Sequence, residues 1–196
     1  MNIREEIDKI REEGYNEANA EARLCQDILL KAISESSLKR NVTIKGGVVM
    51  RNLSKSARRA TQDIDLDVEQ EEYCFDICFQ EDGASLLMNS REQIITEKTK
   101  SLLRFMTRNT RYKDVFDIYY LKDNVNLEKI QYCISKYIYG DSTLSVNNID
   151  DVISRLEMVF SDKSYIKEIN RSRKNWIGVD VEKVLNGDLE FFKGLK

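Results

Sequence analysis

Two short segments of this chain combine residue types that can hold a metal-bound phosphate. The first is the double glycine Gly46-Gly47, and the second is the alternating run DIDLD at residues 63–67. Glycines at the entrance of a helix let backbone N–H groups approach a phosphate, and the helix dipole favours its negative charge. Side chains alternate along a strand, so Asp63 and Asp65 share a face and offer oxygen ligands for Mg²⁺. Together the segments predict a site for a magnesium-bound triphosphate.

Basic side chains accompany both segments. No acidic residue occurs from residue 48 to 62, where the basic residues are Arg51, Lys55, Arg58 and Arg59. A second basic stretch runs from residue 96 to 113, with Glu97 as its one acid and with Lys98, Lys100, Arg104, Arg108, Arg111 and Lys113. The whole chain has 31 basic and 34 acidic residues and a net charge of −3. Binding to a phosphate polymer therefore depends on local basic segments.

The composition excludes several other kinds of site. The chain has no histidine, which removes Ser-His-Asp and Cys-His catalysis and His-ligated zinc. A calcium loop of the EF-hand type is disfavoured because its sixth and twelfth positions would be Val68 and Cys74. A P-loop is excluded because no Gly-Lys-Ser/Thr follows the glycines. The four cysteines lack metal or redox spacing and are expected to be buried free thiols: Cys25, Cys74, Cys78 and Cys133.

Each segment alone also has a plain structural interpretation. The acidic run is compatible with a solvent-facing edge strand, and Gly46-Gly47 with an ordinary tight turn. The occurrence of both segments, in this order and with basic residues between them, favours the phosphate-binding interpretation.

Both segments fit a known sequence pattern. Lys45-Gly46-Gly47 and the run RATQDIDLD at residues 59–67 look like a K-G-G motif followed by R-x-[ST]-x-D-[IL]-D. A later block resembles an E-x4-E-K helix and an R/K-D-x-x-D helix, through Glu92, Glu97, Lys98, Lys113, Asp114 and Asp117. Over about residues 20–122 the chain resembles nucleotidyltransferases of the DNA polymerase β superfamily, and most closely the AbiEii/AbiGii abortive-infection toxin family.

The resemblance implies an activity and a set of partners. The activity would be the Mg²⁺-dependent transfer of a nucleoside monophosphate from an NTP to an RNA acceptor, the 3′ end of tRNA. A cognate antitoxin, which need not touch the toxin, would complete a toxin–antitoxin system. The implied roles are metal binding and catalysis for Asp63 and Asp65, catalysis for Lys98 and Asp114, and nucleotide binding for Lys45, Gly46, Gly47, Arg59 and Arg108.

The chain departs from the family pattern after Asp67. Family members carry a further segment there, with a third carboxylate on its own strand. In one alignment, residues 63–68 and 73–79 form a hairpin in which Asp76 supplies this carboxylate. In the other, which the run from residue 79 into the helix after Ser90 favours, the 73–79 strand is the later strand of the family and the segment is missing.

The shortened interval keeps other functions open. One is a nucleotide-binding or interaction module that retains the fold without turnover. Another is a helical protein-interaction domain in which the acidic strand is incidental.

Hydrophobic periodicity predicts the elements that position these residues. The first forty residues suit two helices broken near Gly14, and residues 42–45 and 63–68 suit strands around a helix at 48–53. After a strand at 73–79, helices are expected at 91–108, 110–122, 126–139, 147–160 and 163–194, the last broken near Gly178.

These elements predict an α+β fold with two domains. A nucleotidyltransferase-like domain with a small mixed sheet is expected over residues 1–90, and a helical domain that contributes to the site over 91–196. The N-terminus is too charged for a signal peptide, and no apolar run reaches the roughly 20 residues of a membrane span. A cytoplasmic protein with no membrane partner is therefore expected.

Overall fold

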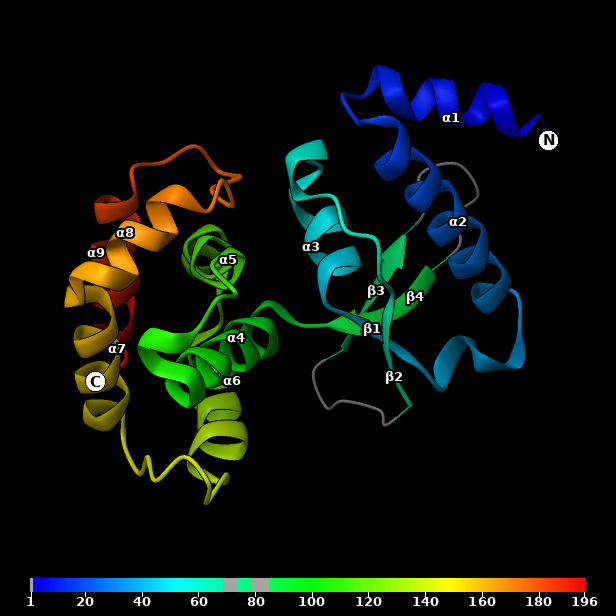
Figure 1. The fold of residues 1–196 in the computed structure, drawn as a ribbon. Coiled ribbons are helices and arrows are strands. Elements are labelled where there is room, and N and C mark those ends of the chain that lie inside the picture. The colour runs from blue at the N-terminus through cyan, green and yellow to red at the C-terminus, as the bar shows by residue number, and fades with distance from the viewer. Residues whose placement is uncertain (1, 69–73, 79–84) are drawn as a thin grey trace. The chain divides into compact units, whose positions relative to one another are not determined.

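The computed structural model describes residues 2–68, 74–78 and 85–196 (Figure 1). The chain divides into two compact units, Met1–Ser90 and Arg91–Lys196. The first unit combines helices with a sheet, and every regular element of the second that the structure describes is helical. The expected α+β fold class is confirmed.

Two helices open the first unit, α1 (Ile3–Glu12) and α2 (Glu17–Ser34). Each begins at an asparagine whose side chain accepts a hydrogen bond from a backbone N–H of the first turn. Gly14 lies between them at φ +98°, a conformation that favours glycine, so the break occurs where the sequence predicts it. The side chains buried between the two helices are Ile10, Tyr15, Ala20 and Leu24.

Four strands form the sheet of this unit, in the order β2-β1-β4-β3. Their bounds are β1 (Thr43–Lys45), β2 (Asp65–Asp67), β3 (Cys74–Cys78) and β4 (Ser85–Asn89). β1 runs antiparallel to β2 and parallel to β4, and β3 runs antiparallel to β4. The helix α3 (Gly47–Ser54) follows β1 directly, and the short helices of this unit are η1 (Ser37–Arg40) and η2 (Ala57–Arg59).

The strand order corrects one of the two alignments of the sequence. The hairpin of β2 with β3, which would make Asp76 a third carboxylate, is wrong because β1 and β4 lie between these strands. Three strand spacings separate β2 from β3, or about 14 Å. β3 pairs with β4 instead, in agreement with the alignment that makes β3 the later strand. The ends of the expected 73–79 strand, Tyr73 and Phe79, lie outside the described residues.

Helices make up the second unit. Their bounds are α4 (Arg91–Phe105), η3 (Met106–Arg108), α5 (Lys113–Leu121), η4 (Lys122–Asn124), α6 (Leu127–Ile134), the π-helix η5 (Ser135–Tyr139), α7 (Ile149–Ser161), α8 (Lys163–Arg171) and α9 (Val181–Lys193). The five helical regions that the periodicity predicts are confirmed, including the break at Gly178, which has φ +73°. Over the described residues, none of the helices combines the length and the apolar composition that crossing a bilayer requires.

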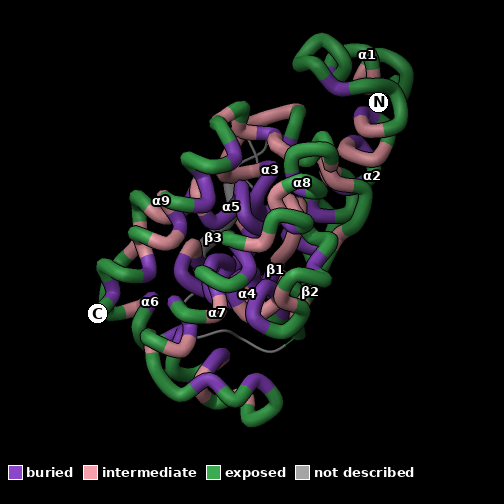
Figure 2. Tube along the Cα trace, turned by 60° about the vertical axis from the view of Figure 1, so that its left-hand side comes forward, coloured by how far each residue is buried: buried purple, intermediate pink, exposed green. Residues whose placement is uncertain are grey.

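The helices α4 and α5 are the most buried elements of this unit, as their largely purple tubes show (Figure 2). They also bury an unusual number of polar side chains: Glu92, Gln93, Thr96, Lys98, Thr99, Asp114 and Asp117. Polar groups are costly to bury unless they are paired, so this concentration marks α4 and α5 as a candidate site.

The structure describes the side chains of two of the four cysteines, and those of Cys74 and Cys78 lie outside its description. Cys133 is a buried free thiol, as expected, whereas the expectation is wrong for Cys25, which lies on the exposed side of α2.

Candidate functional site

In the first unit, the double glycine and the acidic strand come into direct contact. β1 and β2 pair with Lys45 opposite Asp65, so the glycine turn follows beside the acidic strand. Gly46 is the N-cap of α3 with φ +71°, and a Cβ at this position would lie 2.9 Å from the Asp65 carboxylate carbon. At Gly47, a Cβ would lie 2.6 Å from the Cβ of Thr61. Only glycine fits both positions, and the missing side chains leave the α3 N-terminus open beside a carboxylate.

β2 is shorter than the strand predicted at 63–68: it spans Asp65–Asp67, and Asp63 lies before it. The predicted alternation holds for the three paired residues. Leu66 lies opposite the buried Ile44, whereas Asp65 and Asp67 share a face with Lys45. The Nζ of Lys45 lies 2.9 Å from Asp67 Oδ2. Lys45 therefore neutralises the third carboxylate of the run, and the exposed members are Asp63 and Asp65.

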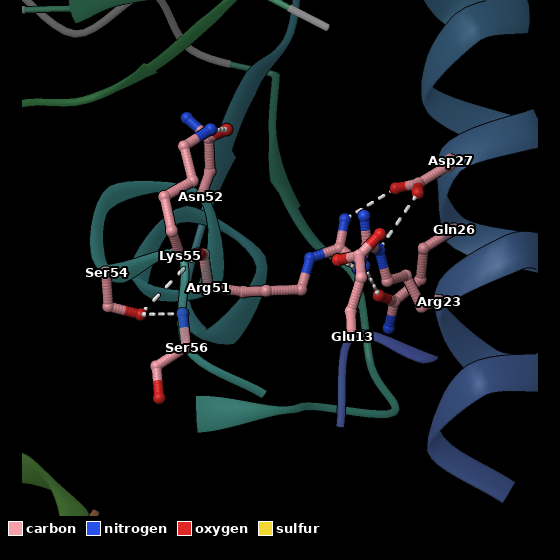
Figure 3. A network of polar contacts seen from close by, with 9 residues as sticks. All are labelled: Glu13, Arg23, Gln26, Asp27, Arg51, Asn52, Ser54, Lys55 and Ser56. Carbon is pink, nitrogen blue, oxygen red and sulfur yellow. Dashed lines mark hydrogen bonds and ion pairs between the residues drawn. The ribbon is translucent and has the colours of Figure 1, made fainter. Parts of the chain in front are cut away.

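A polar network supports the segment that carries these carboxylates, and Figure 3 shows the part of it that joins α2 to α3 through Arg51, Gln26 and Asp27. Gln26 on α2 donates through Nε2 to the backbone oxygens of Thr61 at 3.0 Å and Asp63 at 3.4 Å. Its Oε1 accepts from Arg51 on α3 at 2.9 Å, and Arg51 also contacts Asp27 at 2.6 Å. Arg51 thus ties two helices to the acidic segment. Gln26 has no distinguishing feature in the sequence and is seen to matter only in three dimensions.

The two arginines expected to bind nucleotide have different surroundings. Arg59 ends η2 in the first unit and is 5% exposed, so it lies inside that unit. Arg108 ends η3 in the second unit and is exposed.

In the second unit, Lys98 on α4 is held between two aspartates of α5. Its Nζ lies 2.9 Å from Asp114 Oδ1 and 2.7 Å from Asp117 Oδ2. The three side chains are 10%, 4% and 0% exposed, in that order. A buried ion pair requires close geometry and additional donors to offset desolvation, so these helices hold the lysine in a defined position.

The two aspartates differ in their remaining partners. Asp114 Oδ2 faces Arg111 Nε at 3.3 Å, and the Arg111 side chain is 67% exposed. Asp117 Oδ1 accepts a hydrogen bond of 2.9 Å from the indole Nε1 of Trp176. Asp114 thus lies on the outer side of Lys98 and Asp117 on its inner side. The contribution of Trp176 has no counterpart in the sequence motif.

The first glutamate of the later motif has a structural role. Glu92 is 4% exposed, and its Oε1 accepts from the backbone N–H of Asn126 at 2.8 Å. It therefore fixes the residue before α6.

A further buried acid lies on α9. Asp188 is 0% exposed, and neither of its oxygens has a hydrogen-bond partner among the described residues. Burial raises the pKa of the Asp188 carboxyl well above its ordinary value, against a smaller opposing effect of Lys122. Burial therefore favours the protonated form of this carboxyl over the charged one.

The carboxylates of the first unit fit Mg²⁺ in one particular way. Within residues 2–68, 74–78 and 85–196, no three Cys, Asp or Glu side chains gather as a cluster that could hold a metal. Mg²⁺ is commonly bound by one or two carboxylates together with substrate phosphates. Asp63 and Asp65 match that arrangement, so the metal is expected to bind together with a triphosphate.

A comparison with known families matches more than half of the chain. The model described as nucleotidyl transferase AbiEii toxin, type IV TA system, covers residues 71–183. This range includes Lys98, Asp114, Asp117 and Trp176, and it begins after the acidic strand. No curated protein and no solved structure gives a significant match.

Proposed function

The chain belongs to the AbiEii family of nucleotidyl transferase toxins of type IV toxin–antitoxin systems, and we propose that it transfers a nucleoside monophosphate from an NTP to an RNA acceptor. The contact between Gly46 and the Asp65 carboxylate is the observation that carries this proposal for the chain's own residues. It brings an anion-binding helix entrance beside an exposed acidic strand.

In the first unit, Gly46 and Gly47 admit the triphosphate to the N-terminus of α3, where backbone N–H groups face it. Asp63 and Asp65 hold Mg²⁺, which supplies positive charge to the phosphate under attack. Lys45 keeps Asp67 neutralised, so this carboxylate adds little repulsion toward the nucleotide.

In the second unit, Lys98 and Asp114 carry the proposed catalytic roles. Lys98 provides a buried cation whose position two carboxylates define. Such a fixed charge stabilises developing negative charge because it needs no reorganisation during the reaction. Asp114 has the outer position and is the carboxylate assigned to the reacting groups.

The acceptor we propose is the 3′ end of tRNA, with a cognate antitoxin as the second partner. The basic stretch from residue 96 to 113 supports a nucleic-acid partner. Arg104, Arg108 and Arg111 are exposed there. Lys100 and Arg104 also contact Asp141, at 2.8 and 2.7 Å, which fixes part of this basic surface.

Incubation of the protein with Mg²⁺, each labelled NTP and total tRNA tests the proposal. We expect label to enter RNA with the wild-type protein, and to fall to background without Mg²⁺ or in Asp65→Ala. Asp8→Ala is the matched control, because Asp8 is an exposed carboxylate on α1. Transfer that is unchanged in Asp65→Ala would exclude catalysis by this strand.

A second candidate function is nucleotide binding without transfer. The strand order favours it, because β3, which carries Asp76, lies at the opposite edge of the sheet from β2. Calorimetric titration distinguishes the two candidates: Mg²⁺-dependent NTP binding without any transfer supports this one, and observed transfer excludes it.

A further inference from the structure

Trp176 is the single tryptophan of the chain and connects a distant segment to the Lys98 cluster. It lies between α8 and α9, is 7% exposed, and donates its indole N–H to Asp117. The family resemblance of the sequence assigns it no role.

We propose that Trp176 is a positioning residue: its indole N–H fixes Asp117, and Asp117 in turn fixes Lys98 beside Asp114. The consequence for catalysis rests on the proposed transferase function, whereas the positioning itself does not.

The burial of Asp117 makes each of its donors important. The side chain is 0% exposed, so water does not hydrate its charge. Lys98 contacts one carboxylate oxygen at 2.7 Å and Trp176 contacts the other at 2.9 Å. Loss of the indole donor destabilises the ionised form of the buried Asp117 carboxylate and therefore weakens its ion pair with Lys98.

The segment that carries Trp176 is itself well defined. Asn175 donates through Nδ2 to the backbone oxygen of Val179 at 2.7 Å, and its Oδ1 accepts from the N–H of Gly178 at 3.0 Å. The Trp176 ring also packs on Tyr120 of α5, with centroids 5.1 Å apart and planes tilted by 57°. The indole N–H is therefore presented to Asp117 in a fixed direction.

The second oxygen of Asp114 has a different environment: it lies 3.3 Å from Nε of the exposed Arg111 and accepts no hydrogen bond from the described residues. The cluster thus combines an anchoring carboxylate, Asp117, with an outward one, Asp114, and Lys98 between them. Trp176 acts on the anchoring side alone.

Amine labelling tests the positioning without any nucleotide. Acetic anhydride modifies the deprotonated amine, so a lysine that is held in ion pairs and buried reacts slowly. In Trp176→Phe we expect Lys98 to react about tenfold faster, the scale of a lost hydrogen bond to a charged group. Lys100, on the same helix and paired with Asp141, is the internal reference, and its rate should not change. An unchanged ratio of Lys98 to Lys100 labelling in the folded variant would overturn the proposal.

Two further variants separate positioning from general destabilisation. Phe192→Leu shortens a buried aromatic residue of α9 that donates no hydrogen bond, and it should leave the labelling ratio unchanged. Asp117→Asn weakens the same link from the acceptor side, so it should raise Lys98 labelling, and it replaces Trp176→Phe if that variant does not fold. Equal labelling ratios in Phe192→Leu and the folded link variant would contradict the proposal.

Kinetics of transfer give the catalytic readout. We expect Trp176→Phe to lower kcat about tenfold with little change in KM for the NTP, and to add little in an Asp117→Asn background, since both changes act through one link. If Lys98 labelling increases in Trp176→Phe but the wild-type protein shows no transfer, the positioning role is supported and the proposed transferase function is rejected. Transfer with unaltered kcat in Trp176→Phe would reject the catalytic role of the positioning.

Discussion

At the scale of single residues, Gly46 and Gly47 shape the proposed phosphate site of the first unit because they have no side chains. Gly46 and Gly47 have neighbours so close that any larger side chain would displace Asp65 or Thr61. The same absence of side chains opens the N-terminus of α3. A substitution at Gly46 or Gly47 should therefore displace the acidic strand.

Gly46→Ala tests this coupling. The positive φ and the overlap with Asp65 should lower the free energy of unfolding by about 1–3 kcal/mol. The displaced carboxylate should also weaken NTP binding, and the loss in binding free energy should exceed the loss in stability. Thermal unfolding and calorimetric titration measure the two effects. Gly194→Ala is the control: Gly194 has φ −70° and its nearest atoms lie at 3.4 Å, so stability should change by less than about 0.5 kcal/mol. Full NTP affinity in Gly46→Ala would show that the contact has no function.

Asp188 gives a prediction about the pH dependence of stability. Its pKa is raised by burial in the folded state, so the folded protein keeps a proton that the unfolded chain releases near its ordinary pKa of about 3.9. The contribution of Asp188 to stability is therefore fully present at low pH and declines as the pH rises toward the folded pKa.

The asparagine of the Asp188→Asn variant cannot ionise. The free energy of unfolding of this variant, relative to that of the wild type, should therefore increase as the pH is raised from 5 to 8. Urea unfolding at several pH values measures this difference. Asp123→Asn, at an exposed carboxylate that is 74% accessible, should leave the pH dependence unaltered. A difference between Asp188→Asn and the wild type that stays constant over this range would show that Asp188 does not hold a proton.

Elements can be predicted from this sequence more reliably than their pairing. The helices follow from apolar spacing, asparagine caps and the breaks at Gly14 and Gly178, all of which are local. β4 was not predicted because its apolar residues Leu86, Leu87 and Met88 are consecutive, so no alternation of polar and apolar residue types marks it. Strand order depends on long-range pairing, which the hydrophobic pattern of a short strand does not specify.

The same limit applied to the site. The glycine turn and the acidic strand are marked by local motifs, and their contact follows once β1 pairs with β2. Gln26 and Trp176 meet their partners only through the folded chain, at separations of 35 and 59 residues. Neither of them has a local feature that indicates its role.

The brace between α2 and α3 makes a prediction at this scale. Gln26→Met keeps the size of the side chain but removes its hydrogen bonds to Thr61, Asp63 and Arg51, so it should destabilise the protein by about 1–3 kcal/mol and weaken NTP binding. Thermal unfolding and titration measure both effects. Gln131→Met, at an exposed position on α6, is the matched control and should change stability by less than about 0.5 kcal/mol. Equal effects of the two substitutions would show that the brace is dispensable.

At the scale of the whole molecule, the matched family range and the compact units have different boundaries. The range 71–183 contains most of the second unit and only the end of the first. The second unit has fully buried apolar side chains of its own on several helices, among them Leu102, Phe116, Ile118, Leu156 and Phe192. A unit with its own core is expected to fold by itself.

Residues 91–196 expressed alone should therefore unfold cooperatively on heating, with the Lys98 cluster intact. Circular dichroism measures the transition, and acetic anhydride labelling should show Lys98 as protected as in the full chain. A broad, non-cooperative transition would show that the second unit depends on the first for its stability.

The presence of one tryptophan, hydrogen-bonded to Asp117, has a practical consequence. All indole fluorescence of the protein originates beside Lys98, so its emission maximum and quenching report on that cluster with no background from elsewhere. Any molecule that draws Lys98 away from Asp117 should change the charge next to the indole and shift the emission. The protein thus carries an intrinsic optical probe with which nucleotides, RNA fragments and inhibitors can be screened by binding alone.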